Sequence, residues 1–282
     1  MTGSPTHEPW EVYALKYTRN DKPRRMDVML GEGGSTDPMP MDYFIWVLCR
    51  GSRTVLVDLG FHAQVAARRN RVLLRTPLEA LATMDLHPAN IDDIVITHLH
   101  FDHAGGIDQF PDTPIHLQAS EMAFATGACM AMPAIGGFYE EDDVKELVRK
   151  LFRGQLTLHE GDDVLEPGLS VHWIGGHTGG TQVIRVWTRR GWLVLASDAS
   201  HYFVNVLQRR PFMWTYNVGD HLLGFERLLA LADSTDHLIP GHDPLVMEQY
   251  PPPCADLQGI VARLDADPLF SVHDRIPVQA GR

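Results

Sequence analysis

Short runs of aliphatic, β-branched and aromatic residues recur along the chain and predict β-strands. Residues 43–49 and 54–58 form two such runs, and the residues 50–53 between them are typical of a hairpin turn. The sequence Arg-Arg-Gly at 189–191 predicts a second hairpin turn. Further strands are expected at 91–97, 113–118, 156–159, 169–174, 182–188, 192–196 and 235–239.

Helices are marked by a longer hydrophobic period. In residues 140–152, apolar side chains recur at i, i+3, i+4 and i+7 from Val144, with acidic residues at the start and basic residues at the end. Helices are also expected at 77–84, 120–126 and 221–232. Three prolines at 251–253 end the regular pattern, and we expect the tail beyond Val272 to be loose.

The order of these elements predicts an α/β fold in which two β-sheets pack together with helices on their outer faces. No break in composition divides the chain. We therefore expect one domain over residues 1–282, with residues 1–40 as an N-terminal extension and residues 251–282 as a C-terminal tail. Hydrophobic residues make up 44% and charged residues 21%, which excludes a disordered chain or a coiled coil.

The charge balance and the cysteines narrow the classes of function. A net charge of −12 leaves no general footprint for nucleic acid or for an anionic membrane surface. Cys49, Cys129 and Cys254 lie far apart, are odd in number and lack CxxC spacing, so they do not form a disulfide framework, which fits a reducing compartment. The N-terminus lacks the features of a signal peptide, and no apolar run is long enough to span a membrane, so we expect a cytoplasmic protein.

Histidine is unusually frequent, with 15 copies, and one segment concentrates it. His98, His100, Asp102 and His103 lie within six residues, directly after a predicted strand. Two residues of a strand that are separated by one project to the same side, so His98 and His100 can face one point while the other two face a second. Imidazole nitrogens with a carboxylate oxygen are donors that zinc accepts.

Three more candidate ligands follow predicted strands further along the chain. They are His177 after 169–174, Asp198 after 192–196, and His242 after 235–239. Each stands beside small residues, mostly glycine, whose backbone can approach a crowded centre closely. Any one of these residues alone would be a weak signal.

Together these segments resemble the metallo-β-lactamase superfamily over about residues 43–242. The resemblance implies an αββα sandwich of two mixed β-sheets, with a binuclear zinc site at one edge. It also implies the ligands: His98, His100 and His177 for the first zinc ion, Asp102, His103 and His242 for the second, and Asp198 bridging both. Asp58 resembles the buried aspartate that supports the metal loop from behind.

The motifs at 97–106, 176–182 and 197–200 are most similar to the N-acyl homoserine lactonase branch. This branch implies that a small-molecule lactone is opened by a hydroxide bridging the two zinc ions, with Asp102 carrying a proton to the leaving alkoxide. A tyrosine that contacts the substrate carbonyl is expected three residues after the bridging aspartate. His201 stands there and Tyr202 follows it, so either side chain is a candidate for this catalytic role.

Other functions remain open at this stage. The same metals support hydrolysis of a cyclic amide, a phosphodiester or a thioester. The thioester case resembles glyoxalase II, although only 40 residues follow His242 here, too few for that enzyme's C-terminal domain. Iron-based redox chemistry is disfavoured by the intact first motif, and a binding module without catalysis is disfavoured by the full ligand set.

Two further features bear on substrate and assembly. Arg209 and Arg210 follow the predicted site and are either a solvated pair or a site for a substrate carboxylate. In the second case a small polar or aromatic lactone would be preferred. Methionine and aromatic residues cluster at 39–44, 129–133 and 212–216. Each cluster either belongs to the core, lines an apolar pocket or forms a homodimer contact.

Overall fold

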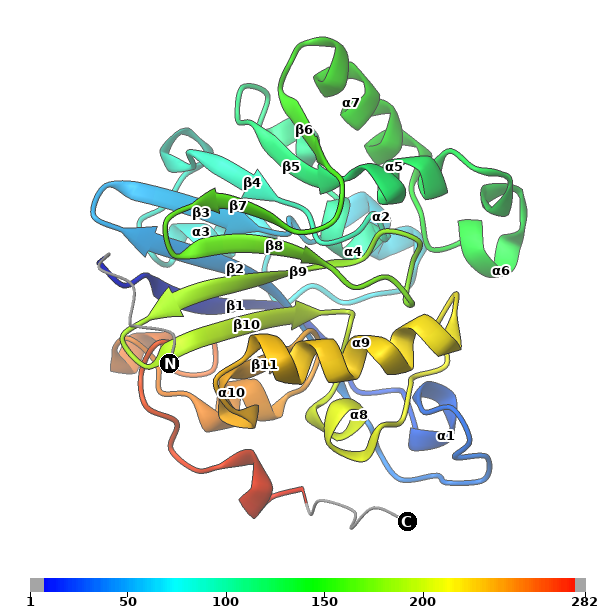
Figure 1. Cartoon of the computed structure of the whole chain (residues 1–282), viewed down its shortest axis with the longest axis vertical. Coiled ribbons are helices and arrows are strands. Elements are labelled where there is room, and N and C mark those ends of the chain that lie inside the picture. Colours follow the sequence, from blue (N-terminus) through cyan, green and yellow to red (C-terminus); the bar gives the residue numbers. More distant parts are fainter. Residues whose placement is uncertain (1–7, 277–282) are drawn as a thin grey trace.

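Two β-sheets stack face to face in the computed structural model of the protein, which describes residues 8–276 (Figure 1). The first sheet has the strand order β12-β1-β2-β3-β4-β5-β6 and the second β11-β10-β9-β8-β7. The first contains β1 Glu11–Asn20, β2 Met41–Arg50, β3 Arg53–Val57, β4 Asp93–Val95, β5 Ile115–Gln118, β6 Leu156–His159 and β12 Val261–Arg263. The second contains β7 Asp163–Glu166, β8 Leu169–Trp173, β9 Gln182–Thr188, β10 Gly191–Ser197 and β11 Leu238–Pro240.

Both sheets are mixed. In the first sheet, β12, β1, β2 and β3 pair antiparallel, and β3, β4, β5 and β6 pair parallel. In the second, β7 to β10 pair antiparallel and β11 runs parallel to β10. The predicted α/β sandwich of two mixed sheets is thereby confirmed.

Helices cover the outer face of each sheet (Figure 1). α3, α5 and α7 lie against β1, β5 and β6 of the first sheet, and α9 lies against β10 of the second. The helices are α1 Arg25–Val28, α2 Ala63–Arg68, α3 Pro77–Ala82, α4 Phe101–Ala104, α5 Ala119–Ala125, α6 Pro133–Gly136, α7 Glu141–Phe152, α8 Phe203–Gln208, α9 Val218–Leu231 and α10 Leu245–Gln249. Within residues 8–276, none of them is long and apolar enough to cross a bilayer.

The alternation of side chains along the strands builds these layers. Ile45 of β2 packs in the cluster beneath the helices of the first sheet. Its neighbours Phe44 and Trp46 point the other way, into the core between the sheets, where they meet Leu193 and Leu195 of β10. Because both faces of β2 are buried, this strand is a continuous apolar run in the sequence.

The structure corrects the expectation for the two ends of the chain. The expected extension over 1–40 contributes β1, and the expected tail over 251–282 contributes β12, which pairs with β1. The sequence of β1 conceals its burial, because charged residues such as Lys16 interrupt the apolar ones. The part of the predicted loose tail beyond residue 276 lies outside the described residues.

Some element boundaries also differ. The strand expected at 235–239 is a 3₁₀ turn followed by β11, and the short strand β7 was not expected. α9 begins at Val218, before the expected start at His221. The side chain of Asn217 accepts hydrogen bonds from the backbone of Gly219 and Asp220, which fixes this earlier helix start.

Candidate metal centre

The predicted ligands meet because the strands that carry them end at the same edge. β4 runs parallel to β3, so Asp58 and His98 follow neighbouring strand ends. In the second sheet β8 and β11 both run in the direction of β10, so His177, Asp198 and His242 all follow carboxyl ends. Carboxyl ends of parallel strands are a common place for sites in α/β proteins.

Gly241 allows the segment after β11 to approach the end of β10 closely. Gly241 precedes His242, and a Cβ atom on it would lie 2.7 Å from the backbone of Ser197 and 2.8 Å from Oδ1 of Asp198. No other residue type fits there without a shift of the backbone. The small residues beside the predicted ligands therefore serve the close packing of strand ends, as the sequence indicated.

The first group of donor atoms surrounds Nε2 of His177. This nitrogen lies 3.2 Å from Nε2 of His98, 2.9 Å from Nδ1 of His100 and 3.2 Å from Oδ2 of Asp198. Two ligands of one tetrahedral zinc ion lie about 3.3 Å apart, given zinc–nitrogen bonds of about 2.0–2.1 Å. The spacing of the four donors therefore suits a single metal ion.

The second group surrounds the other oxygen of Asp198. Oδ1 of Asp198 lies 3.0 Å from Nε2 of His242 and 3.3 Å from Nε2 of His103. Oδ2 of Asp102 lies 3.8 Å from each of these two nitrogens. The structure thus brings all seven predicted ligands together in two groups, with Asp198 between them.

The unpaired atoms of this cluster fit a cation. Nε2 of His103, Nε2 of His242 and Oδ1 of Asp198 are buried, and none has a hydrogen-bond partner within residues 8–276. Leaving buried polar atoms without partners costs free energy, and that cost is avoided when the atoms coordinate a metal ion. The donors are nitrogen and oxygen atoms only, a set that suits zinc and related divalent ions.

The ring nitrogens that face away from the cluster are anchored, which orients the imidazoles. Nδ1 of His177 donates to the carbonyl of Trp214 at 2.7 Å, and Nδ1 of His242 donates to the carbonyl of Asp42 at 2.9 Å. Nδ1 of His103 lies 2.7 Å from Oδ2 of Asp58. Each of these bonds occupies Nδ1 and turns Nε2 toward the cluster, where it is available to a metal ion.

Asp58 occupies the supporting position that the sequence analysis assigned to it. It follows β3 with a left-handed φ of 59° and is fully buried. Besides His103, its carboxylate accepts bonds of 2.8 Å from both the backbone nitrogen and the hydroxyl of Thr97. Asp58 therefore connects the end of β4 to His103 behind the cluster.

The histidines of the two donor groups also differ in the direction of their pKa shifts. Burial lowers the pKa of His98 and His100 well below the usual range, so both rings are neutral. Burial acts in the same direction on His103 and His242, but the carboxylates of Asp198 and Asp102 outweigh it and raise the pKa of both rings. In return, neighbouring histidines hold the pKa of Asp198 well below its usual value, against the effect of burial.

A family model described as the metallo-beta-lactamase superfamily matches residues 39–242, which include every residue of the cluster. The chain belongs to the metallo-beta-lactamase superfamily. The resemblance that the sequence motifs indicated is therefore confirmed, and the cluster is the metal-binding region of a metal-dependent hydrolase superfamily.

Curated relatives within the superfamily are similar over part of their length. An N-acyl homoserine lactonase of Bacillus cereus is 32% identical over 146 residues, covering 51% of this chain and 49% of the relative. N-acyl homoserine lactonase AiiA of Bacillus thuringiensis subsp. kurstaki is 30% identical over 133 residues, covering 47% and 48%. The chain thus spans about half the length of these lactonases.

Solved structures share the fold at lower identity. The crystal structure of a quorum-quenching N-acyl homoserine lactone lactonase has a TM-score of 0.68 and 21% identity, covering 87% of this chain and 95% of that one. An N-acyl homoserine lactone hydrolase with the product N-hexanoyl-L-homoserine at its catalytic metal centre has a TM-score of 0.68 and 20% identity, covering 86% and 95%.

One buried residue that supports the cluster was not predicted. Glu121 of α5 is fully buried, and it accepts hydrogen bonds from the backbone of Leu99 and Gly180 and from the hydroxyls of Tyr139 and Thr178, at 2.5–3.1 Å. Burial raises the pKa of Glu121, and the four donors oppose that effect. Glu121 thereby joins the loops that carry His98 and His177. A lone glutamate in a short helix gives no signal for this role in the sequence.

The two candidates for the substrate carbonyl differ in position. Nε2 of His201 lies 2.8 Å from Oδ2 of Asp198, and burial lowers the pKa of His201 to about 3. Tyr202 directly precedes α8, and its hydroxyl donates to the carbonyl of Met39 at 3.2 Å, in a separate cavity of about 410 Å³. The prediction that Tyr202 contacts the substrate is corrected. Its side chain points toward Met39 and does not line the pocket beside the metal centre.

The structure favours the first of the two interpretations of the arginine pair. Arg209 bonds to Glu226 at 2.6 Å, and its side chain is 64% exposed. Arg210 pairs with Glu32. Both guanidinium groups therefore already have carboxylate partners of their own, and neither lines the pocket beside the metal centre. They are a solvated pair and not a site for a substrate carboxylate.

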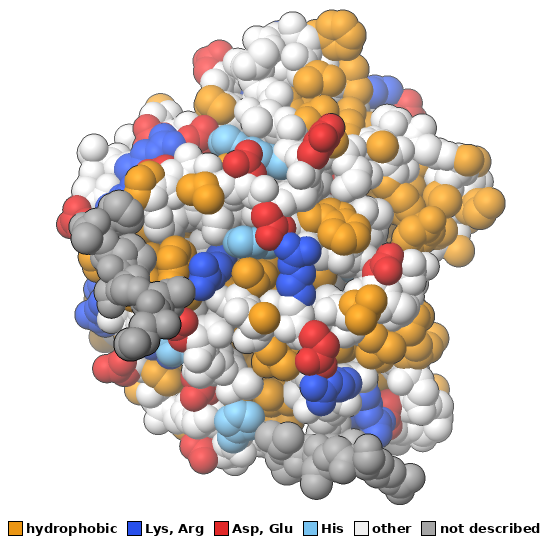
Figure 2. Space-filling view, viewed as in Figure 1, with side chains coloured by type: hydrophobic (Ala, Val, Ile, Leu, Met, Phe, Trp, Pro, Cys, Tyr) orange, Lys and Arg blue, Asp and Glu red, His pale blue; other side chains and the backbone are white. Residues whose placement is uncertain are grey.

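That pocket is the opening through which a substrate can reach the cluster. It has a volume of about 260 Å³, and His100 and His177 form part of its wall. The remaining wall is largely apolar and comes from Phe124, Ala134, Ile135, Phe138, Met213, Trp214, Thr215 and Tyr216. Hydrophobic side chains also gather on the surface over α6 (Figure 2). Of the three methionine and aromatic clusters, 212–216 contributes most directly to this wall.

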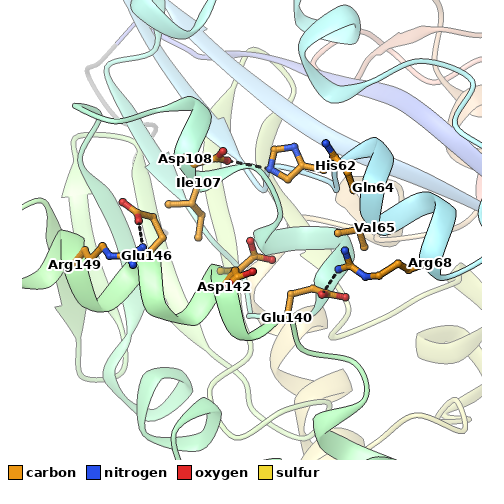
Figure 3. Close-up of a pocket in the computed structure, with 11 residues that line it drawn as sticks. His62, Gln64, Val65, Arg68, Ile107, Asp108, Glu140, Asp142, Glu146 and Arg149 are labelled. Atoms are coloured by element: carbon orange, nitrogen blue, oxygen red, sulfur yellow. Dashed lines mark hydrogen bonds and ion pairs between the residues drawn. The ribbon is translucent and has the colours of Figure 1, made fainter.

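Another cavity, of about 390 Å³, lies apart from the cluster and is lined mainly by charged residues (Figure 3). Its acidic side chains largely have partners: Asp108 contacts His62, Glu140 contacts Arg68, and Glu146 contacts Arg149. None of the seven clustered ligands lines it. We therefore place the functional site at the smaller apolar pocket.

The supporting role of Asp58 predicts a loss of metal affinity on substitution. Asp58→Ala should bind zinc about 10–100-fold more weakly, because Nδ1 of His103 loses the acceptor that orients its ring. Competition with a chromophoric chelator measures this. Asp58→Asn tolerates the left-handed φ and serves as the companion variant, and zinc retention at the wild-type level in both would contradict the assignment.

The bonds of Glu121 predict a loss of stability. Glu121→Gln should lower the free energy of unfolding by about 1–3 kcal/mol, because its amide group cannot accept all four hydrogen bonds. Urea denaturation checks this, with Glu141→Gln as the control, since the Glu141 side chain is 82% exposed. Equal stability of both variants would show that Glu121 does not hold the two loops together.

Proposed function

We propose that this protein is a binuclear zinc hydrolase that opens the lactone ring of N-acyl homoserine lactones. The observation that carries the proposal is the position of two donor groups sharing Asp198, directly beside an apolar pocket. The lactonase relatives at about 30% identity support it. An enzyme with this activity would degrade the lactone signals of quorum sensing.

The donor set supports the following assignment of zinc ligands. His98, His100 and His177 would hold one ion and His103, His242 and Asp102 the other, with Asp198 shared between them. Two zinc ions bound there would lower the pKa of a shared water and polarise an ester carbonyl, which is the chemistry that ester hydrolysis needs.

A residue of the chain would supply the proton transfer that ring opening needs. Asp102 has the more exposed of the two carboxylates in the cluster, since 10% of its side chain is accessible compared with 4% for Asp198. Ring opening transfers one proton from the attacking water to the leaving alkoxide of the lactone. We assign the acceptance and delivery of that proton to the carboxylate of Asp102.

The pocket favours an apolar acyl chain. Aromatic side chains of Phe124, Phe138 and Trp214 line it, and the two arginines that could have bound a polar lactone pair with glutamates elsewhere. Each CH₂ group removed from water contributes about 0.8 kcal/mol. We therefore propose acyl homoserine lactones as substrates, in place of the small polar or aromatic lactones that the arginines suggested.

The metal proposal predicts two zinc ions per chain. Elemental analysis of the purified protein should give a ratio of two, and dialysis against a chelator should abolish lactone hydrolysis. Asp198→Ala should lose most of the activity, because its carboxylate is shared by both donor groups. Full activity in that variant, or in metal-free protein, would refute the proposal.

The pocket proposal predicts a dependence on chain length. Trp214→Ala should lower kcat/KM for a ten-carbon acyl chain about tenfold more than for a four-carbon chain, since the longer chain loses more apolar contact. The backbone carbonyl that orients His177 remains in this variant. Arg209→Asn is the control and should match the wild type. Equal losses for both chain lengths would argue against an acyl-binding role.

A further inference from the structure

His201 lies between the shared carboxylate and an aromatic ring. Nε2 of His201 is 2.8 Å from Oδ2 of Asp198. The imidazole stacks on the ring of Phe212, with centroids 3.4 Å apart and planes inclined by 8°. Only 2% of His201 is exposed, so its orientation is fixed on both sides.

The hydrogen-bond pattern determines which nitrogen carries the proton. A carboxylate oxygen is only an acceptor, so Nε2 of His201 donates to Asp198. Nδ1 is buried and has no hydrogen-bond partner within residues 8–276. The ring therefore donates its N–H to Asp198 and has no free donor for a substrate carbonyl.

This arrangement differs from the role expected of a substrate-binding residue at this position. Oδ2 of Asp198 faces His177 and Oδ1 faces His242, so the carboxylate serves both donor groups only in one orientation. A donor on Oδ2 restricts rotation about the last bond of the aspartate side chain. His201 supplies that donor from a rigid, stacked ring.

We propose that His201 is a positioning residue that holds Asp198 in its shared orientation, and that it acts on metal binding and not on the substrate. The proposal rests on the metal centre of the proposed function. It does not depend on which lactone the enzyme uses, because its first measurement is zinc affinity.

Two substitutions separate the donor from the stacked ring. His201→Phe keeps an aromatic ring against Phe212 and removes the donor. His201→Gln keeps an amide donor at a similar reach and removes the ring. His221 provides a matched control, since it is also buried and packs against Phe212, with centroids 4.7 Å apart, but lies outside the cluster.

The experiment measures zinc affinity by chelator competition, the Co(II) absorption spectrum, and kcat and KM for N-hexanoyl homoserine lactone. We expect His201→Phe to bind zinc about 10–100-fold more weakly, with an altered Co(II) spectrum and a lower kcat at unchanged KM. His201→Gln should stay within a few fold of the wild type, and His221→Phe should retain the wild-type affinity and spectrum.

Three outcomes would overturn the inference: wild-type zinc affinity in His201→Phe, a raised KM in that variant with both metals retained, or equal losses in His201→Phe and His201→Gln. If His201→Phe does not fold, His201→Leu takes its place in the same comparison. Wild-type protein that binds two zinc ions but opens no lactone would refute the proposed substrate and leave the role of His201 testable.

Discussion

The carboxylate of Asp198 is the constraint on which the rest of this structure depends. Its two oxygens face different groups of imidazoles, and its side chain is only 4% exposed. A charge buried in this way is stable only when opposite charges or donors compensate it. The surrounding histidines do so in part, since they keep the pKa of Asp198 far below its usual range. Metal ions shared by the same carboxylate would complete the compensation.

The fold meets this constraint with ordinary strand geometry. Parallel strands in each sheet end at one edge, so short loops deliver all the donors to one place. Two buried carboxylates outside the donor set then fix the loops: Asp58 bonds to Thr97 and His103, and Glu121 joins the loops of the two sheets. Residues of α6 and of the segment before α9 contribute to the wall of the apolar pocket beside the cluster.

The sequence predicted the donors well because they occupy recognisable positions. His98 and its neighbours form a dense motif, and isolated donors such as His242 follow strands and adjoin glycine. It predicted β1 poorly, since charged residues mask the burial of that strand, and the sequence alone does not show which strand will pair beside it. Glu121 was missed because its partners lie far apart in the chain. Whether Tyr202 reaches the centre depends on a side-chain direction that spacing does not determine.

The central claim is that two metal ions share Asp198. The most direct measurement is an anomalous difference map, collected at the zinc edge from a crystal of the zinc-loaded protein. The account predicts two peaks about 3.5–4 Å apart on either side of the Asp198 carboxylate, one bounded by His177 and its partners and the other by His242. A single peak, or two peaks of which one lies away from Asp198, would contradict it.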